Sequence, residues 1–272
     1  MKRYLLVVVL LVALFTACGG EKKTLNGYWD GFVAEAVYDN VDGAQQQFRA
    51  WAELLAEADT TAQKNAIDDF VAKVCADEVC YYIYTEWAMG HLYGLWSPVR
   101  NEFAFEYLLR NLMANVSLAE DNREFASLLD ILAHNRVGER AEEFKMFSPA
   151  GVESCLLDYR GQRVVMVLVD VTCPSCVDIM TQIEANKEIM TAAERGELTL
   201  LLVAVGQIPE SIGEFAARYE GTLWQVRCAT RGDVARAHYD TNASPALFVI
   251  DADGVIEVGM TRDVKRVEQC VL

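Results

Sequence analysis

The stretch VVMVLVDVTCPSC (residues 164–176) joins an apolar run to two cysteines that are separated by two residues. Six consecutive apolar residues, four of them valine, are typical of a strand that is buried on both faces of a sheet. Residues 174–195 carry a helical pattern, and Pro174 suits the first turn of a helix because its missing N–H costs nothing there. The stretch therefore predicts that Cys173 stands where a buried strand ends and a helix begins.

This position favours redox chemistry for the cysteine pair. The unpaired N–H groups and the dipole of a helix N-terminus stabilise an anion, which lowers the pKa of a thiol placed there. We predict that Cys173 attacks a disulfide as its thiolate and that Cys176 resolves the mixed disulfide that forms. A purely structural disulfide and half of a zinc site stay open as alternatives. Structural zinc takes four ligands, and Cys75 and Cys80 would supply the other two only if the helical half folded over the pair, so no metal is predicted.

Strand and helix patterns alternate after residue 135, which predicts an α/β domain with a mixed sheet. LTLLLVAVG (198–206) is predicted as a second buried strand, and ALFVI and VIEVG as a hairpin that turns at DADG. Another hairpin is predicted to turn at Pro149–Gly151. The predicted helices are residues 174–195, with Val177, Met180, Ile183 and Met190 on one face, a helix that opens on Pro209, and a short helix at the end of the sequence.

Residues 28–135 carry a different pattern, in which apolar residues recur at helical spacing. Asp59-Thr60-Thr61 separates the first two helices, and Ser97-Pro98 marks the start of a helix over residues 100–115. An all-α domain is therefore expected before the α/β domain. The aromatic residues of YYIYTEW (81–87), with Tyr93 and Trp96, fit a helical core better than a peptide-binding groove, although the groove stays open as an alternative.

Two further stretches make the α/β half resemble the thioredoxin superfamily. In NASPALFVIDADGVI (242–256), Pro245 directly precedes a strand and hairpin, as the cis-proline of that superfamily does. VGERAEEF (137–144) resembles the entry segment of its extracytoplasmic thiol–disulfide oxidoreductases, with Glu142 in place of the usual proline. The resemblance implies that Pro245 is cis and faces the cysteine pair, and that Ser244 offers its backbone to an extended substrate peptide.

The chain also departs from the thioredoxin pattern. Thr172 stands where most thioredoxins have Trp, and Val167 stands where thioredoxin has a buried Asp that assists proton transfer to the resolving cysteine. Asp170 and Asp178 flank the pair, and their negative charge opposes the helix dipole, so a very acidic thiol is not expected. His238, close to the proline, is a lesser candidate for tuning the thiol.

The N-terminus, MKRYLLVVVLLVALFTACGG, has the features of a lipoprotein signal. Two basic residues precede an apolar run that is too short to span a bilayer, and FTAC resembles the cleavage site of bacterial lipoproteins, with Cys18 as the lipidated residue. The helical half and its join to the second half resemble lipoproteins of the Bacteroidetes in which an uncharacterised helical domain precedes a thioredoxin-like domain. We therefore expect a signal peptide (1–17), a tether (18–27), a helical domain (28–135) and a thioredoxin-like domain (136–272).

Charge and cysteine content narrow the function further. The formal net charge of −16 argues against a nucleic-acid partner. Of the eight cysteines, seven remain when Cys18 is set aside, and an odd number cannot all pair within the chain. Cys75 and Cys80 are predicted to be small buried residues rather than a disulfide. The pairing of the remaining three, Cys155, Cys228 and Cys270, is not predicted.

Together these features predict a lipid-anchored thiol–disulfide oxidoreductase on the periplasmic side of the envelope, by analogy at the outer membrane. The resemblance favours the reductase direction, with protein thiols or disulfides as substrates and a membrane electron donor for turnover. No cofactor is predicted, because the cysteine pair itself carries the electrons. The alternative is a non-catalytic binding module of thioredoxin fold, with the helical half as its recognition surface.

Overall fold

The computed structural model describes residues 24–119 and 122–271, so the predicted signal peptide and Cys18 lie outside the described residues. The chain divides into two compact units, one ending at Tyr84 and one beginning at Thr85. This division falls within helix α5 (Glu78–Ala88). The change from helices to strands comes later, after helix α7 (Arg123–Ala133). The compact units therefore do not coincide with the change in secondary structure.

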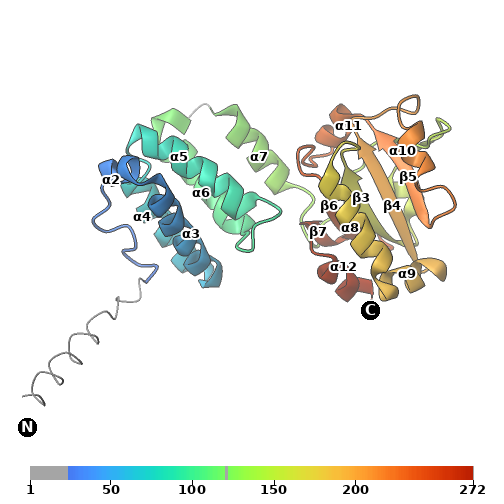
Figure 1. Ribbon diagram of the computed structural model, residues 1–272, viewed down its shortest axis with the longest axis horizontal. Coiled ribbons are helices and arrows are strands. Elements are labelled where there is room, and N and C mark those ends of the chain that lie inside the picture. Colours follow the sequence, from blue (N-terminus) through green and yellow to red (C-terminus); the bar gives the residue numbers. More distant parts are fainter. Residues whose placement is uncertain (1–23, 120–121, 272) are drawn as a thin grey trace, which may run out of the picture. The chain divides into compact units, whose positions relative to one another are not determined.

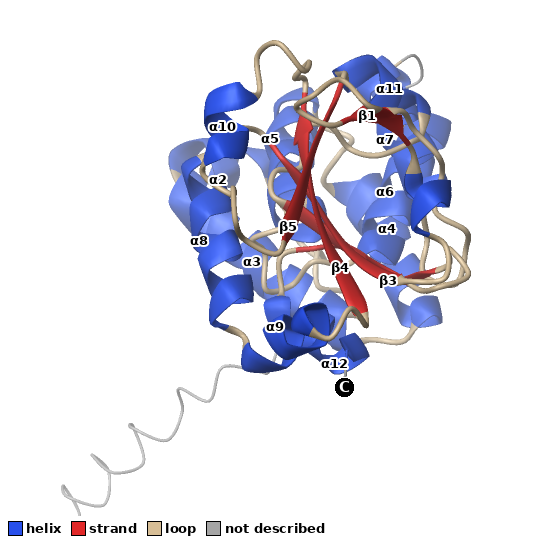
Figure 2. Cartoon of the chain, turned by 90° about the vertical axis from the view of Figure 1, so that its right-hand side faces the viewer, coloured by secondary structure: helices blue, strands red, loops and turns tan. Residues whose placement is uncertain are grey.

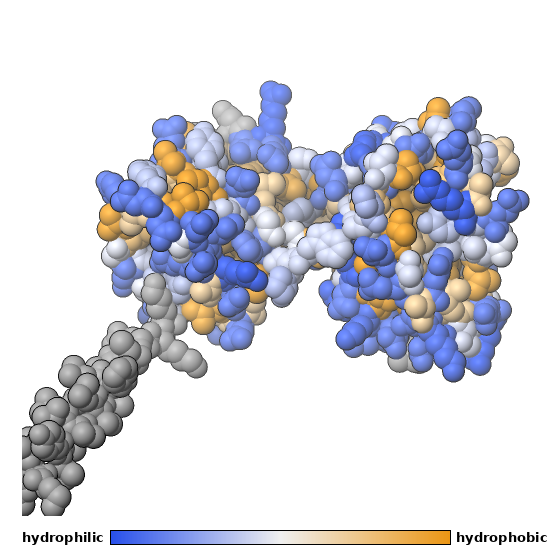
Figure 3. Space-filling model, viewed as in Figure 1, coloured by the Kyte–Doolittle hydropathy of each residue, from blue (hydrophilic) through white to orange (hydrophobic). Residues whose placement is uncertain are grey.

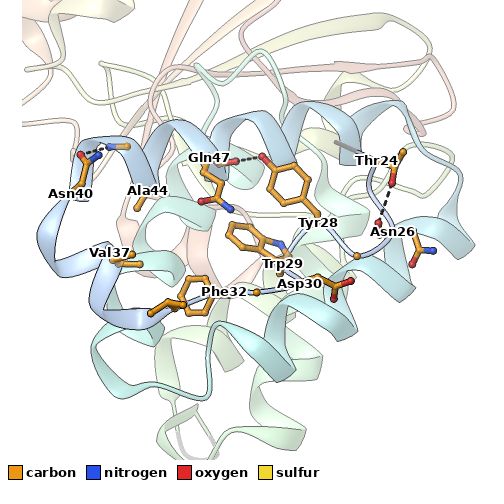
Figure 4. Close-up of a pocket in the computed structure, with 15 residues that line it drawn as sticks. Thr24, Asn26, Tyr28, Trp29, Asp30, Phe32, Val37, Asn40, Ala44 and Gln47 are labelled. Carbon is orange, nitrogen blue, oxygen red and sulfur yellow. Dashed lines mark hydrogen bonds between the residues drawn. The ribbon is translucent and has the colours of Figure 1, made fainter. Parts of the chain in front are cut away.

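The first unit is helical, and polar side chains cap its helices. Asn40 accepts a hydrogen bond from the N–H of Gly43, and Asp59 accepts from Thr61 and Ala62, so the predicted break at Asp59 is confirmed. A preceding segment packs along α3, where the Tyr28 hydroxyl donates to the carbonyl of Gln47 at 2.8 Å (Figure 4). The helices of this unit are α2 (Ala34–Asp39), α3 (Val41–Glu57), α4 (Thr60–Lys73) and the first part of α5.

Aromatic side chains form the core of the first unit. The rings of Trp51 and Phe70 stack with centroids 4.8 Å apart, and Trp29 meets Tyr84 edge to face at 5.6 Å. Phe48 contacts the rings of Trp51, Phe70 and Tyr84, and all five side chains are almost completely buried. Burial of this much aromatic surface holds the helices together. The pocket drawn in Figure 4 lies beside this core, and its lining residues all belong to the first unit.

The second unit begins with further helical elements. A π-helical turn, η1 (Met89–Tyr93), continues α5, and α6 (Glu102–Asn115) is followed by the short η2 (Ser117–Ala119) and by α7. The Asn101 side chain accepts a hydrogen bond from Ala104 N and so caps α6, which therefore starts slightly later than Ser97-Pro98 indicated.

A seven-stranded mixed sheet follows, in the order β2-β1-β5-β4-β3-β6-β7. The central strand β3 pairs in parallel with β4 and antiparallel with β6, and every residue of β3 after the first is buried. The two predicted hairpins are confirmed as β1–β2 and β6–β7. The strands are β1 (Met146–Phe147), β2 (Glu153–Ser154), β3 (Arg163–Val169), β4 (Leu198–Val205), β5 (Trp224–Ala229), β6 (Ala246–Ile250) and β7 (Ile256–Thr261).

Helices cover both faces of this sheet (Figures 1 and 2). One face packs against α8 (Pro174–Ala185), α9 (Lys187–Glu194) and α12 (Val264–Val271), which confirms the predicted C-terminal helix. The other face packs against η3 (Leu156–Tyr159) and α11 (Arg231–Arg236). These two apolar clusters enclose β3 and β4 from both sides, which explains their unbroken apolar sequences.

Three local predictions were wrong. Residues 174–195 form two helices rather than one, because the Asn186 side chain accepts from Ile189 N and starts α9 anew. Val177 is 59% exposed and does not belong to the buried face of α8. The helix expected to open on Pro209 is the short α10 (Gly213–Ala217).

The visible surface is mostly hydrophilic, as the formal net charge of −16 leads us to expect. Figure 3 shows hydrophilic residues over most of the visible face of each half, with small apolar patches between them. None of the helices in residues 24–119 and 122–271 is both long and apolar enough to cross a membrane.

Candidate active site

Cys173 lies at the N-terminus of α8, where the sequence places it. Strand β3 ends at Val169, a short turn follows, and Cys173 is the N-cap residue with extended backbone angles (φ −80°, ψ 113°). Pro174 occupies the first helical position, and the N–H of Cys176 donates to the carbonyl of Cys173 at 3.2 Å. Cys173 is partly exposed and Cys176 is buried, so the first thiol of the pair is the accessible one.

The Ser244–Pro245 loop lies against both cysteines. Its peptide bond is cis, as the resemblance implied. The Sγ of Cys173 is 3.7 Å from the carbonyl oxygen of Ser244, and the Sγ of Cys176 is 3.2 Å from its hydroxyl. Sheet register explains this arrangement, because Leu168 near the end of β3 pairs with Ala246 at the start of β6. The loop that precedes β6 must therefore lie beside the turn that follows β3.

The two thiols differ in acidity. Burial acts to raise the pKa of Cys173, but hydrogen bonds to its sulfur from Ser175, Cys176 and Ser244 outweigh it, and the pKa falls below that of a free cysteine. Burial raises the pKa of Cys176 to about 12. At neutral pH the accessible sulfur is thus the better nucleophile, and the buried one keeps its proton.

The carboxylate of Asp170 is bound by Thr172 and Arg231. Thr172 donates to it from its hydroxyl at 2.7 Å and from its N–H at 2.9 Å, and Arg231 donates at 3.1 Å. The hydroxyl and N–H of Thr172 lower the pKa of Asp170. The backbone N–H of Asp170 donates to the Ser244 hydroxyl at 2.7 Å, which fixes the loop against the end of β3. Arg231, a residue that the sequence did not single out, therefore pairs with this carboxylate beside the cysteines.

A comparison with solved structures identifies the fold. A thioredoxin-like protein from Bacteroides caccae matches with a TM-score of 0.76 at 17% sequence identity, over 91% of this chain and 90% of that chain. This chain has a thioredoxin-like fold. A scan against family models finds no match, and neither does a search of curated proteins.

Other solved structures match about half of this chain. A thiol:disulfide interchange protein from a Bacteroides species matches with a TM-score of 0.42 at 17% identity, over 50% of this chain and 88% of that one. The thioredoxin domain of a thiol-disulfide oxidoreductase from Bacteroides vulgatus matches with a TM-score of 0.38 at 18% identity, over 50% of this chain and 99% of that chain.

The structure shows the surroundings of two residues that depart from the thioredoxin pattern, Glu142 and Val167. Glu142, which replaces the usual proline, donates its N–H to the Asn135 side chain at 2.8 Å, a bond that proline cannot make. Val167 is completely buried in the apolar cluster that includes Cys176. Cys176 therefore has an apolar side chain, and no carboxylate, at this position.

Arg262 is a site residue that the sequence did not indicate as one. It follows β7, and its Nε donates to the carbonyl of Pro245 at 3.1 Å while Nη2 donates to the carbonyl of Ser244. Its guanidinium also lies 3.9 Å from the ring centroid of Trp96. The Ser244 carbonyl, expected to face a substrate backbone, therefore already accepts from a fixed cation.

The Ser175 hydroxyl provides a direct test of the thiol's acidity. It lies 3.0 Å from the Sγ of Cys173 and donates to that sulfur when the thiolate forms. We predict that Ser175→Ala raises the pKa of Cys173, because the charged form loses a hydrogen bond. The pH dependence of iodoacetamide alkylation at Cys173, followed by peptide mass spectrometry, should then shift to higher pH. Thr181→Ala, which removes an exposed hydroxyl from the same helix, serves as control and should leave the curve unchanged.

Among the described residues, Asp130, His134 and His238 are the group whose potential metal-ligand atoms lie within 4.8 Å of one another. The two imidazoles stack face to face with centroids 3.7 Å apart, and the Nε2 of His238 lies 3.4 Å from the Asp130 carboxylate. His134 Nδ1 is also hydrogen-bonded to the carbonyl of Asp130 at 2.7 Å. These contacts already engage both imidazoles within the described residues. His238, a lesser candidate for tuning the thiol, is instead part of this stack.

The other described cysteines have structural surroundings. Cys75, Cys80 and Cys228 are buried, and none of the seven cysteines in the described residues forms a disulfide in the structure. Burial raises the pKa of Cys75 and of Cys80 to about 12, as expected for small apolar residues rather than reactive thiols. Cys228 donates to the carbonyl of Phe147, which joins β5 to β1.

Proposed function

We propose that this protein is a thiol–disulfide oxidoreductase that works by dithiol–disulfide exchange at Cys173 and Cys176. One observation carries the proposal: an accessible thiol of lowered pKa stands at a helix N-terminus, 3.7 Å from the Ser244 carbonyl in the cis-proline loop. Buried structural cysteines have raised pKa values, as the first unit's pair does, so the lowered value at Cys173 distinguishes a reactive sulfur.

The exchange proceeds in two balanced steps. The Cys173 thiolate attacks one sulfur of a substrate disulfide, which forms a mixed disulfide and releases the other sulfur as a thiolate that takes a proton from solvent. Cys176 then loses its proton and attacks the Sγ of Cys173, which forms the Cys173–Cys176 disulfide and releases the second substrate thiol. Two electrons pass from the cysteine pair to the substrate. The raised pKa of Cys176 makes its deprotonation the harder part of the second step.

The direction and the cellular place of the reaction belong to the same proposal. The N-terminal sequence supports export and lipidation at Cys18, with the protein facing the periplasm from the outer membrane. We propose the reductase direction, with disulfides of other proteins as substrates. Turnover then needs a membrane electron donor to reduce the Cys173–Cys176 disulfide again.

One observation favours a second candidate, a non-catalytic binding module whose Cys173–Cys176 bridge stays closed. Val167 gives Cys176 an apolar surrounding with no carboxylate, which suits a stable bridge more than rapid exchange. A structural bridge of this kind has a reduction potential below about −300 mV.

The reduction potential of the pair tests the proposal and separates the two candidates. The chain from Lys22 onward, with its other five cysteines replaced by alanine, would be equilibrated in dithiol buffers and analysed by mass spectrometry after trapping of free thiols. We expect a potential between roughly −120 and −270 mV, the range of working oxidoreductases. A pair that stays bridged below about −300 mV, or never bridges, would contradict the oxidoreductase proposal.

A further inference from the structure

A groove in the second unit borders the Ser244–Pro245 loop. Its volume is about 390 Å³, at the small end of the range for ligand pockets, which suits a few side chains. The helical elements supply Tyr93 and Leu128 to its lining, and the turn that follows η1 supplies Trp96. The thioredoxin-like part supplies Ser244, Met260 and Arg262. The groove is therefore built jointly by the two kinds of structure in this unit.

The interior of the groove is mostly apolar. Leu128 and Met260 are buried, and Tyr93 stacks on Phe105 with centroids 5.0 Å apart. The Tyr93 hydroxyl donates to the Asp240 carboxylate at 2.7 Å, so the polar end of this side chain already has a hydrogen-bond partner within the protein. Most of the surface offered to a ligand at this depth is hydrocarbon, which favours an apolar side chain over a charged one.

Trp96 is the exposed wall of the groove. It is 64% exposed, unusual for so large an apolar side chain, and the Arg262 guanidinium fixes it by lying over its ring. Arg262 in turn donates to the carbonyls of Ser244 and Pro245. A chain of contacts thus runs from the exposed indole to the loop beside the thiols. Tryptophan and arginine are also the residues most often found at the energetic centre of protein interfaces.

Continuity with the cysteine pair indicates what occupies the groove. Ser244 lines the groove and also places its carbonyl 3.7 Å from the Sγ of Cys173. A polypeptide whose cysteine reaches Cys173 passes over Ser244, and its neighbouring residues then lie at the groove. We propose that this groove binds apolar side chains that flank the cysteine of an extended substrate polypeptide, with Trp96 as the specificity-determining residue. This inference rests on the proposed oxidoreductase function.

Two matched peptides test the inference. Each carries one cysteine linked by a disulfide to thionitrobenzoate; one has leucine on both sides of the cysteine and the other has serine at the same positions. Reduced protein is mixed with each, and release of thionitrobenzoate is followed in a single turnover. We expect the leucine peptide to react roughly tenfold faster or more, the scale on which apolar pockets discriminate. In Trp96→Ala the ratio of the two rates should fall toward one, and in Trp96→Phe it should largely recover.

The matched control is Tyr82→Ala, which removes another exposed aromatic ring, 57% exposed and in the first unit, and should keep the wild-type ratio. A wild-type protein that reacts with both peptides at equal rates, or a Trp96→Ala variant that keeps the full ratio, would overturn the groove assignment. A reduced protein that reacts with neither peptide would instead overturn the proposed function. The two failures are therefore distinguishable.

Discussion

Replacing Cys173 with serine is expected to lower single-turnover reduction of a peptide disulfide to the rate measured in protein-free buffer. A serine hydroxyl is not ionised at neutral pH, whereas the Cys173 thiol has a lowered pKa and supplies the thiolate that attacks. The Cys176→Ser variant should behave differently, because it keeps the attacking sulfur and loses only the resolving one. It is expected to stop at the mixed disulfide, detected as a mass increase equal to the substrate half.

The matched control for these variants is Cys270→Ser. Cys270 is partly buried against the apolar cluster that α8, α9 and α12 form with the sheet, and burial raises its pKa. It should therefore take no part in the exchange. Full reductase activity in Cys173→Ser, or an adduct that forms on Cys270 instead, would refute the assignment of the attacking thiol.

The second large effect concerns the stability of the helical unit. Trp51 is completely buried and stacks on Phe70 at 4.8 Å, within the aromatic core of that unit. Trp51→Ala should lower the free energy of unfolding by about 3–5 kcal/mol, because it removes apolar contacts and leaves a cavity that the surrounding rings cannot fill. Chemical denaturation of the whole chain, followed by circular dichroism at 222 nm, measures this loss.

Val79→Ala is the control, since Val79 is exposed and its truncation should change stability by less than about 0.5 kcal/mol. A Trp51→Ala variant within 1 kcal/mol of the parent would mean that the aromatic core of the first unit is not what holds its helices together.

The sequence predicts those parts of the site that depend on local patterns. An apolar run and a proline at the first helical position were enough to place Cys173 at a helix start, and the resemblance to the thioredoxin superfamily placed Pro245 opposite it. Strand β5 was not predicted, because WQVRCA alternates apolar and polar residues and lacks the continuous apolar run of β3 and β4. The break at Asn186 was missed because it depends on a single capping side chain within an otherwise helical pattern.

Long-range contacts between ordinary residues could not be read from the sequence. Arg262 follows a strand without any motif, and only the folded chain brings its guanidinium to the Ser244 carbonyl and the Trp96 ring. Trp96 was interpreted as part of a helical core, yet it is largely exposed. Its position lies outside the regular helices, so helical spacing had no predictive value there.

The pairing of β3 with β6 has a consequence for the newly made chain. The contacts of both thiols with Ser244 join residues 71 and 68 positions apart, and these contacts close only after β6 has docked beside β3. Before that event Ser244 does not yet contribute to the lowered pKa of Cys173, whereas Ser175 and Cys176 lie in the same helical turn as its sulfur. The surroundings of the pair are thus completed only together with the sheet. The two cysteines of an unfinished chain therefore lack one of the partners that set their acidity in the folded protein.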